Sequence, residues 1–515
     1  MSCHDEEEPV PILRASGKSN EKDPMSCHDE EEPVPTLRAS GKSNGKEIDS
    51  ENDLDLDLHE PSLTYRQHSS TIFALAGPIV LSEIFQHTLP IVDIVFVGNL
   101  GNDELGAAAL ATVWFNLWNS AMMGFMTATD TMLAQSFGAR AYGSFAMWTG
   151  NSIVVVTIAS VVTCGLIALC GPCMVLFGQD PDLAAAAGQF SIRLIPGLIP
   201  YYVFKVLTKY LQAQNKVAPG VYIGLFANAV NVFANWFFIY ELNMGLSGAP
   251  WATTITRVGE LVLIVGYIRW KRMELVETMP TISMKNLEIP IIMPFVKLAI
   301  SGALSFACEA WSFEITTILA GLLGTISLDA HIITLSIVAF ISFSFPFAVG
   351  LATSLRVGQL IGEGRSGDAK RSSIVAYAIN IIIQLVLIAI LLPCSKLLGD
   401  LFSNDDEVSE LVAKLVPISC IFMLGDAVLT NTGGVMRGLG KQSLVLKLNI
   451  VAFWVLAIPI GSLMTFATDM GVIGVWWGFG VGIYSAAVIG IYILNRINWR
   501  DEGNNAKLRI SSPSN

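Results

Sequence analysis

The sequence predicts an all-helical integral membrane protein with twelve transmembrane helices, arranged as two lobes of six helices each. Three observations carry this prediction: an apolar composition, long segments without charge, and an internal repeat. Of the 515 residues, 52% are hydrophobic and only 14% are charged, whereas a soluble chain carries about a quarter charged residues. The mean hydropathy of +0.56 is typical of a chain that lies mostly in lipid.

Segments without Asp, Glu, Lys or Arg recur along the chain. They comprise residues 105–129, 141–179, 332–355, 372–395, 448–468 and 470–495. About 20 residues of apolar helix span the hydrocarbon core, and a helix satisfies its own backbone hydrogen bonds there. With the apolar segments between them, these runs predict helices near 70–97, 104–128, 145–172, 183–214, 218–240, 247–270, 293–323, 328–355, 372–398, 408–437, 444–466 and 471–494.

Residues 1–65 have a different composition from the rest of the chain. They hold 17 acidic and 6 basic residues, against 26 and 25 in the remainder, so the net charge of −12 belongs almost wholly to this tail. Residues 1–24 recur at 25–48 with 20 identities, and Met25 is a candidate second start. So polar a segment cannot bury a core, and we expect a disordered cytoplasmic tail.

The predicted helices divide into an N-lobe at 66–270 and a C-lobe at 293–495, joined by a cytoplasmic linker at 271–292 and followed by a polar tail at 496–515. The lobes resemble each other at an offset that drifts only from 223 to 226. For example, Asn99–Gly101 matches Leu322–Gly324, and Leu211–Lys216 matches Met436–Lys441. Six helices are an even number, so the repeat is parallel and leaves a cleft between two lobes. Alternating access through such a cleft is what a transporter requires.

Basic residues predict the orientation. With the N-terminus in the cytosol, the inner loops and tail hold most of them: Arg140, Lys216, Arg269, Lys271, Arg272, Lys285, Arg365, Lys370, Arg371, Lys441, Arg496, Arg500, Lys507 and Arg509. The outer loops at 98–103, 178–182, 241–246, 324–327 and 467–470 hold none. Basic residues favour the cytoplasmic side, so we expect both termini in the cytosol.

Few ionisable residues lie inside the predicted helices, where each charge costs about 3 kcal/mol on insertion scales. Asp93 lies in the first, Glu309 and Glu314 in the seventh, and Asp426 in the tenth. An apolar environment favours the protonated form of a carboxyl group, and carboxylate oxygens can also ligate sodium. We expect these residues to bind the coupling ion, a proton or sodium. The alternative is a structural hydrogen bond between helices, and for Glu314 the two interpretations weigh equally.

Asparagines recur on the fifth predicted helix. Asn228, Asn231 and Asn235 are spaced to share one face, and Thr253 lies on the sixth helix. Either they pack against neighbouring helices, or they form a hydrated cation site with Asp93.

Three charged residues receive structural interpretations. Lys205 and Lys209 on the fourth helix are expected to snorkel to the inner interface. Asp130, at the end of the second helix, is expected to hold a loop rather than contact substrate.

Four segments together resemble the multidrug and toxic compound extrusion family, known as MATE transporters. Phe96–Gly101 is similar to the turn after the family's first helix, and Asp130–Ala139 to its D-T-x-x-x-Q-x-x-G-A stretch. Cys308–Glu314 resembles the C-L-E-W-W-S-F-E segment of eukaryotic members, and Gly434–Lys441 resembles G-V-x-R-G-x-G. The resemblance spans residues 70–495.

The resemblance implies a V of two six-helix bundles that exports organic cations, secondary metabolites or organic acids against proton or sodium entry. It places Glu309 and Asp426 on the family's acidic C-lobe positions. It places Asp93, Asn231 and Thr253 on the cation-site positions of prokaryotic members. Two departures stand out: Asn235 replaces a second aspartate of some members, and Ala310 with Trp311 alters the C-lobe segment.

Other functions fit the sequence less well. A major-facilitator transporter would carry G-x-x-x-D-R-x-G-R-R between helices two and three, where Gly138–Arg140 stands instead. A flippase of lipid-linked oligosaccharides would line its cleft with basic residues, which are few here. We expect no enzyme activity, no cofactor besides the coupling ion and no nucleic acid. The expected partners are small organic substrates and membrane lipids. We expect a monomer in the plasma membrane or in a vacuolar or other organellar membrane.

Overall fold

The computed structural model describes residues 62–510, which belong to one compact unit. The predicted acidic tail and its duplication lie almost entirely outside the described residues. Within the described range the chain forms helices and turns and no strand, in agreement with the predicted fold class.

The N-lobe runs from α1 to α8, and each predicted span has its counterpart. The helices are α1 (Tyr65–Gly98), α2 (Asn102–Phe125), α3 (Thr127–Gly138), α4 (Tyr142–Ala168), α5 (Cys170–Leu176), α6 (Pro181–Ala213), α7 (Ala218–Trp236) and α8 (Gly248–Trp270). Local chemistry explains the start of α6. Asp180 accepts backbone hydrogen bonds at the start of α6, directly before Pro181 at its first position, where a proline loses no hydrogen bond.

The C-lobe follows a linker of short 3₁₀ turns between residues 272 and 287. Its helices are α9 (Ile289–Gly321), α10 (Thr325–Ser344), α11 (Pro346–Gly362), α12 (Ser366–Leu391), α13 (Ser395–Phe402), α14 (Asp406–Gly438), α15 (Gln442–Asn449), α16 (Ile458–Ala467), α17 (Val472–Arg496) and α18 (Trp499–Ile510). Pro346 splits the predicted span 328–355 into α10 and α11, because a proline cannot donate to the preceding turn. The predicted polar tail contains a helix, α18, that sequence reasoning missed.

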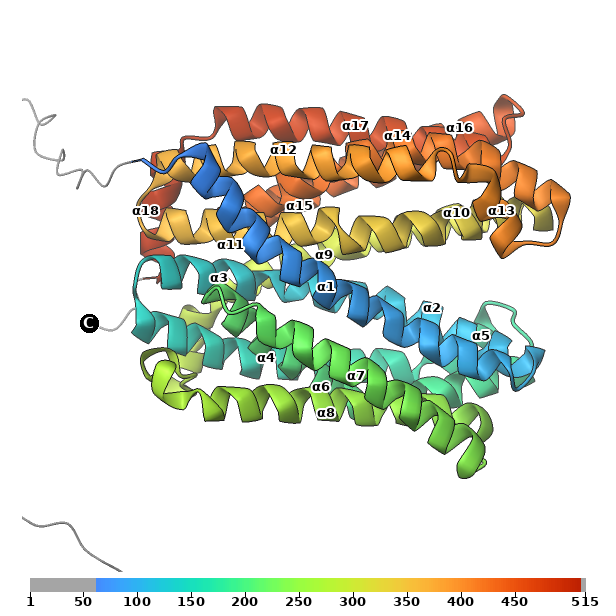
Figure 1. Cartoon of the computed structure of the whole chain (residues 1–515), viewed down its shortest axis with the longest axis horizontal. Helices are drawn as coiled ribbons and strands as arrows, with labels where there is room; N and C mark the ends of the chain where they lie inside the picture. Colours follow the sequence, from blue (N-terminus) through green and yellow to red (C-terminus); the bar gives the residue numbers. More distant parts are fainter. Residues whose placement is uncertain (1–61, 511–515) are drawn as a thin grey trace, which may run out of the picture. The chain divides into compact units, whose positions relative to one another are not determined.

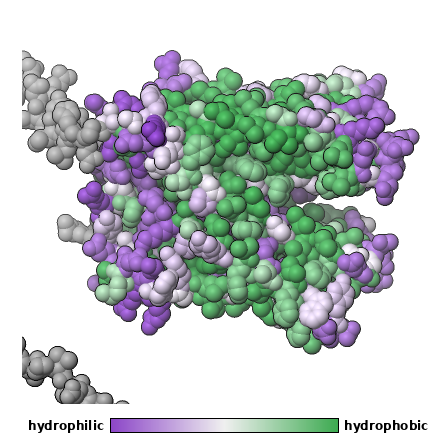
Figure 2. Space-filling view, viewed as in Figure 1, coloured by the Kyte–Doolittle hydropathy of each residue, from purple (hydrophilic) through white to green (hydrophobic). Residues whose placement is uncertain are grey.

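The surface agrees with a membrane location. Eleven helices of the described range are long and apolar enough to cross a bilayer, and α2, at 24 residues, occupies the remaining predicted span. Figure 2 shows a broad hydrophobic band between two hydrophilic ends. The chain is therefore a multi-pass membrane protein.

The backbone confirms the internal repeat. Residues with a left-handed backbone conformation recur at the predicted offset. The pairs are Arg140 with Gly364, Asn215 with Gly440, Asn243 with Asp469, and Gly245 with Gly471. Their offsets run from 224 to 226, so the two lobes turn their chains at equivalent places.

The two lobes lie beside each other, and α1 passes between them (Figure 1). The backbone N–H of Leu63, just before α1, donates to Asp368 on α12 of the C-lobe at 3.2 Å. The helix α1 itself packs on α7 of the N-lobe and on α11 and α12 of the C-lobe. Aromatic side chains of both lobes share one core at the end that holds α18. There Phe145 and Tyr210 of the N-lobe cluster with Phe295 of α9.

Candidate functional site

Four polar side chains from three helices meet in the N-lobe. Asp93 on α1 accepts hydrogen bonds from Asn235 Nδ2 at 2.7 Å and from Asn231 Nδ2 at 3.3 Å, both on α7. The hydroxyl of Thr253 on α8 donates to the other carboxylate oxygen. The structure thus brings together Asp93, Asn231 and Thr253, as the sequence suggested, and adds Asn235. Asn228 instead donates to the backbone carbonyl of Phe85 at 2.9 Å, which is a packing role.

This N-lobe group can hold a proton or a small cation. Asp93 receives neutral donors only, since no cation of the described residues lies within ion-pair distance of it. Both asparagines are fully buried, and Asn235 Oδ1 has no hydrogen-bond partner. Side-chain amides can be oriented either way at similar shape. Rotation of this amide would add an oxygen beside the carboxylate, which is the ligand type that a hard cation takes.

A second polar group lies in the C-lobe. Asn449 Nδ2 on α15 lies 3.3 Å from Glu309 Oε2 and 3.2 Å from Ser305 Oγ, both on α9. Thr430 Oγ1 donates to Asp426 Oδ1 on α14 at 3.4 Å. The charges of Asp426 and of Arg437 both act on Glu309. Ionised Asp426 repels the ionised Glu309, and Arg437 attracts it. Neutralising one of them with a proton or a cation relieves this repulsion.

A stretch of π-helix follows each polar group. One spans Phe237–Glu241, directly after α7 and Asn235, and the other spans Ile450–Ala457, directly after Asn449. Such stretches occur frequently at functional sites, because the wider turn leaves backbone groups free to adjust.

Glu314 does not join the C-lobe group. It follows Glu309 by five residues, which is about 140° around an α-helix. It makes no hydrogen bond or ion pair with any residue in 62–510. Trp311, one of the two departures from the family segment, reaches the other lobe instead. Its indole Nε1 donates to the backbone carbonyl of Leu117 at 3.2 Å.

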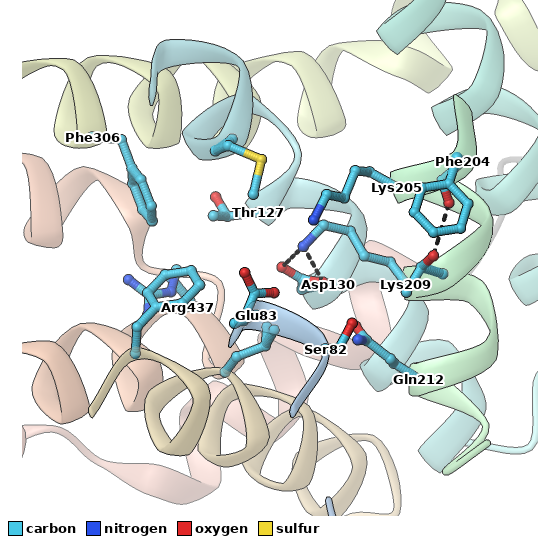
Figure 3. Close-up of a pocket in the computed structure, with 14 residues that line it drawn as sticks. Ser82, Glu83, Thr127, Asp130, Phe204, Lys205, Lys209, Gln212, Phe306 and Arg437 are labelled. Carbon is cyan, nitrogen blue, oxygen red and sulfur yellow. Dashed lines mark hydrogen bonds and ion pairs between the residues drawn. The ribbon is translucent and has the colours of Figure 1, made fainter. Parts of the chain in front are cut away.

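A small cavity, open in part to solvent, lies between the lobes. The helices α1, α3, α6 and α14 bring charged side chains to it from both lobes (Figure 3). The charged lining residues are Glu83, Asp130, Lys205, Lys209 and Arg437. Figure 2 shows a hollow between the two halves at the end that carries α5 and α13.

The structure corrects the interpretation of the lysines and of Asp130. Lys205 and Lys209 do not snorkel to the interface, since they are only 7% and 8% exposed. Lys209 Nζ instead lies 2.6 and 2.8 Å from the two oxygens of Asp130. Asp130 therefore lines the interlobe cavity in a buried ion pair. The positions of Asp130 and Lys209 along the chain do not predict this pairing.

The cavity is closed at its base by hydrogen bonds between the lobes that follow the internal repeat. Gln135 Nε2 on α3 donates to the carbonyl of Gly438 at 2.9 Å, and Gln359 Nε2 on α11 donates to the carbonyl of Ala213 at 3.0 Å. The two donors differ by 224 positions and the two acceptors by 225. We use the name interlobe seal for these four residues together with two glycines packed beside them, Gly138 on α3 and Gly362 on α11.

Those two glycines let the helices α3 and α11 touch. A Cβ on Gly138 would overlap the carbonyl of Gln359, and a Cβ on Gly362 would overlap the carbonyl of Gln135. The two glycines lie 224 positions apart, the offset of the internal repeat, but their packing against the opposite lobe did not follow from that offset.

The helix α18 lies across the interlobe seal. Arg509 donates to Gln135 Oε1 of the N-lobe at 3.0 Å and to the carbonyl of Leu439 of the C-lobe at 3.1 Å. Ser144 of α4 donates to the carbonyl of Ile510 at 3.0 Å. The C-terminal helix therefore links the two lobes at the end where they already meet.

Comparisons with known proteins agree with this architecture. A family model described as MatE matches residues 78–237 and 302–463, one match in each lobe. Multidrug and toxin extrusion protein 2 of Mus musculus is 32% identical over 462 residues, which cover 87% of this chain and 78% of that protein. Multidrug and toxin extrusion protein 1 of Homo sapiens is 30% identical over 438 residues, covering 85% and 76%.

Solved structures share the fold. The eukaryotic MATE transporter AtDTX14 matches with a TM-score of 0.82 at 26% identity, covering 87% of this chain and 100% of that one. A Vibrio cholerae MATE transporter in its bent form matches with a TM-score of 0.76 at 16% identity, covering 87% and 99%.

Proposed function

The chain belongs to the MatE family of transporters, and on this premise we propose that it is a secondary active antiporter. It exports organic cations, xenobiotics or secondary metabolites in exchange for protons or sodium ions, by alternating access. Family membership makes the protein a transporter rather than an enzyme, and it removes the major-facilitator alternative. The relatives at 29–32% identity are named for extrusion of drugs and toxins, which supports efflux over the flipping of lipid-linked oligosaccharides.

The observation that carries the proposal is the pairing of carboxyl groups in membrane-spanning helices with an interlobe cavity that is sealed at one end. Asp93 lies in the N-lobe group, and Glu309 with Asp426 lies in the C-lobe group. Each accepts a hydrogen bond from a neutral donor, and none of the three forms an ion pair with a residue in 62–510. An intramembrane carboxyl group without a permanent counter-ion is suited to taking up and releasing an ion.

The exchange cycle follows from charge repulsion. With the interlobe seal closed, the hollow between the two halves lies at the end that carries α5 and α13, which holds the predicted outer loops (Figure 2). A proton or sodium ion that enters there neutralises the C-lobe group and relieves the repulsion between Glu309 and Asp426. The helices α9 and α14, which carry these groups, then repack, the seal opens, and the ion leaves to the cytosol. The restored negative charge favours the return to the outward state, with substrate in the cavity.

We place both termini in the cytosol, since the interlobe seal lies at the end that carries the predicted basic loops. The protein acts as a monomer in the plasma membrane or in an organellar membrane such as the vacuolar membrane, with each cavity formed within one chain. N-lobe and C-lobe groups could bind separate ions, one in each lobe.

The test uses the purified full chain in proteoliposomes with ethidium as the organic cation. Flux is measured under an imposed pH gradient and, separately, under an imposed sodium gradient. We expect wild-type protein to concentrate ethidium under one of the two, and this identifies the coupling ion. Glu309→Gln and Asp426→Asn keep the side-chain volume and remove the titrating group, so each should abolish gradient-driven accumulation.

The matched control is Glu410→Gln. Glu410 is an exposed carboxylate on α14, paired with Lys414 at 2.9 Å, and its removal should leave flux unchanged. Elution as a single species in size-exclusion chromatography verifies folding. Accumulation at the wild-type rate by either C-lobe variant would reject that residue as the coupling site and direct attention to Asp93.

A further inference from the structure

An arginine inside the N-lobe lies between two carboxyl groups and pairs with neither. Arg257 is on α8, four residues after Thr253, which donates to Asp93, and three residues before Glu260. Residues at these spacings share one face of a helix. The charge of Arg257 acts on both Asp93 and Glu260, yet within residues 62–510 it forms no ion pair. The arginine is therefore placed to choose between two partners.

Two aromatic rings position the guanidinium of Arg257 without using its hydrogen-bond donors. The centre of the guanidinium lies 4.7 Å from the ring centre of Tyr201 on α6 and 5.0 Å from that of Phe115 on α2. Ring faces attract a guanidinium as a charge. Its Nη1 is buried and has no hydrogen-bond partner. A buried donor without an acceptor is costly, so the side chain gains free energy by turning this group toward an ionised carboxylate.

Glu260 has one oxygen free to accept from Arg257. The residue is only 1% exposed, and its Oε1 accepts a hydrogen bond from Gln86 Nε2 on α1 at 2.8 Å. Its other oxygen, Oε2, is buried and has no partner. An arginine and a glutamate three residues apart on one helix face are neighbours that can form an ion pair. A change of side-chain rotamer therefore suffices to join these two groups.

Asp93 competes with Glu260 for the same arginine. Its two oxygens accept hydrogen bonds from neutral donors only, Asn231, Asn235 and Thr253. An empty, ionised Asp93 attracts Arg257. A proton or a sodium ion on Asp93 cancels this attraction, and Glu260 is then the stronger partner.

The helices packed against α8 bring few other charges to this place. Within residues 62–510, the charge that acts on Asp93 is that of Arg257. The helix α7 carries no charged residue. The other ionisable groups that face the arginine or follow it toward the interlobe cavity are Tyr201, Tyr202 and Lys205 on α6 and Glu83 and His87 on α1.

We propose that Arg257 is a positioning residue that responds to the ion on Asp93. It turns toward Asp93 when that carboxylate is empty, and toward Glu260 when Asp93 holds a proton or a sodium ion. The inference rests on the proposed antiport for its role in transport, and it names a residue through which the N-lobe group acts on the rest of its lobe. Glu260 in turn acts on Lys205, which lines the interlobe cavity (Figure 3). The pairing of Glu260 therefore changes the electrostatic environment of a cavity side chain.

The test follows ion binding at Asp93 without substrate and without a gradient. Full-length protein in lipid nanodiscs is titrated with protons and, at fixed pH, with sodium chloride in exchange for choline chloride. Infrared difference spectra record the C=O stretch of a protonated carboxylic acid. The part of this signal that is lost in Asp93→Asn reports Asp93, and the ion concentration at half saturation is the measured quantity.

Arg257→Gln removes the competing charge, so we expect half saturation of Asp93 at an ion concentration about tenfold lower. Glu260→Gln removes the alternative partner and leaves Arg257 to Asp93, which should raise that concentration about tenfold. In the Arg257→Gln background, Glu260→Gln should change it by less than about twofold, because the effect of Glu260 passes through the arginine. Arg257→Lys keeps the charge and should return the value to within about threefold of wild type.

The matched control is Arg193→Gln. Arg193 lies in the same lobe on α6 and donates to Gln189 at 3.0 Å, so its removal should leave half saturation of Asp93 unchanged. Elution as a single species in size-exclusion chromatography verifies the folding of each variant. If Arg257→Gln does not fold, Arg257→Met takes its place, since methionine keeps an apolar contact with the two rings.

Three outcomes would overturn the proposal. The first is an unchanged half saturation in folded Arg257→Gln protein. The second is an equal effect of Glu260→Gln with and without Arg257, which would mean that Glu260 acts on Asp93 directly. The third is the absence of a titrating Asp93 signal in the wild type. Failure of the proposed antiport is a separate result, because it appears as absent gradient-driven flux and leaves these titrations unaffected.

Discussion

Replacing Gln359 with leucine should shift the protein away from the state with a closed interlobe seal. Gln359 Nε2 donates to the carbonyl of Ala213 and to Asn215 Oδ1, both at 3.0 Å, and the side chain is only 2% exposed. Leucine keeps much of the volume and removes both hydrogen bonds. The carbonyl oxygen of the fully buried Ala213 then stays unsatisfied in the closed state, while water reaches it when the lobes part.

The magnitude follows from these two bonds. A buried hydrogen bond contributes about 0.5–1.5 kcal/mol net, so Gln359→Leu should disfavour the closed state by about 1–3 kcal/mol. The ratio of open to closed molecules should then rise by a factor of about 5–150. Gln135→Leu should act in the same direction, because Gln135 holds the equivalent place in the other lobe.

Spin labels can report this shift. Gly143 at the start of α4 and Gly367 at the start of α12 are exposed, are equivalent in the repeat, and have no atom within 4 Å of an added Cβ. Cysteines placed there, in a background with the eight native cysteines replaced, carry the labels for a distance measurement by double electron–electron resonance. Gln189→Leu, at an exposed position, is the control. An unchanged distance distribution in Gln359→Leu would refute the role assigned to these hydrogen bonds.

Three further predictions test other contacts. Gly362→Ala should raise the open fraction in the same distance measurement, because its Cβ would meet the carbonyl of Gln135; a closed-state distribution would contradict this. Lys209→Met should lower the free energy of unfolding by about 3–5 kcal/mol, because it leaves Asp130 buried and unpaired. Adding Asp130→Asn should recover most of this loss when thermal unfolding is measured. If the double variant recovers nothing, the ion pair does not have the role assigned to it. A cysteine at Gln179 should react with an impermeant maleimide on intact cells and one at Gly143 should not, and the reverse pattern would invert the orientation.

The sequence contained enough to predict which segments cross the membrane and where each lobe begins. Hydropathy accumulates along a helix, so each span was visible locally, and Pro346 alone explains why the span at 328–355 is split in two. The repeat was visible because equivalent turns need equivalent backbone conformations. The helix α18 was not predicted, since its composition is polar and its packing partners, such as Gln135 and Leu439, lie far away in the chain.

The sequence likewise predicted some residues of the candidate site and not others. Asp93, Glu309 and Asp426 could be singled out because a carboxyl group within an apolar run is costly and therefore conspicuous. For Lys205 and Lys209 the sequence predicted positions at the membrane interface, since a lysine near a helix end is usually explained by snorkelling. Burial of these two lysines depends on neighbouring helices, and the sequence of one helix does not show which helices surround it.

What the sequence determined by itself was the set of membrane-spanning helices, their parallel duplication and the few ionisable groups placed in those helices, because each of these can be recognised along the chain. Only the tertiary structure decided which of those groups meet. Thr131 donates to the carbonyl of Arg437 across 306 positions, and Lys209 pairs with Asp130 across 79. Such contacts depend on how two lobes pack against each other, and that packing is set by shape and charge in three dimensions rather than by spacing along the chain.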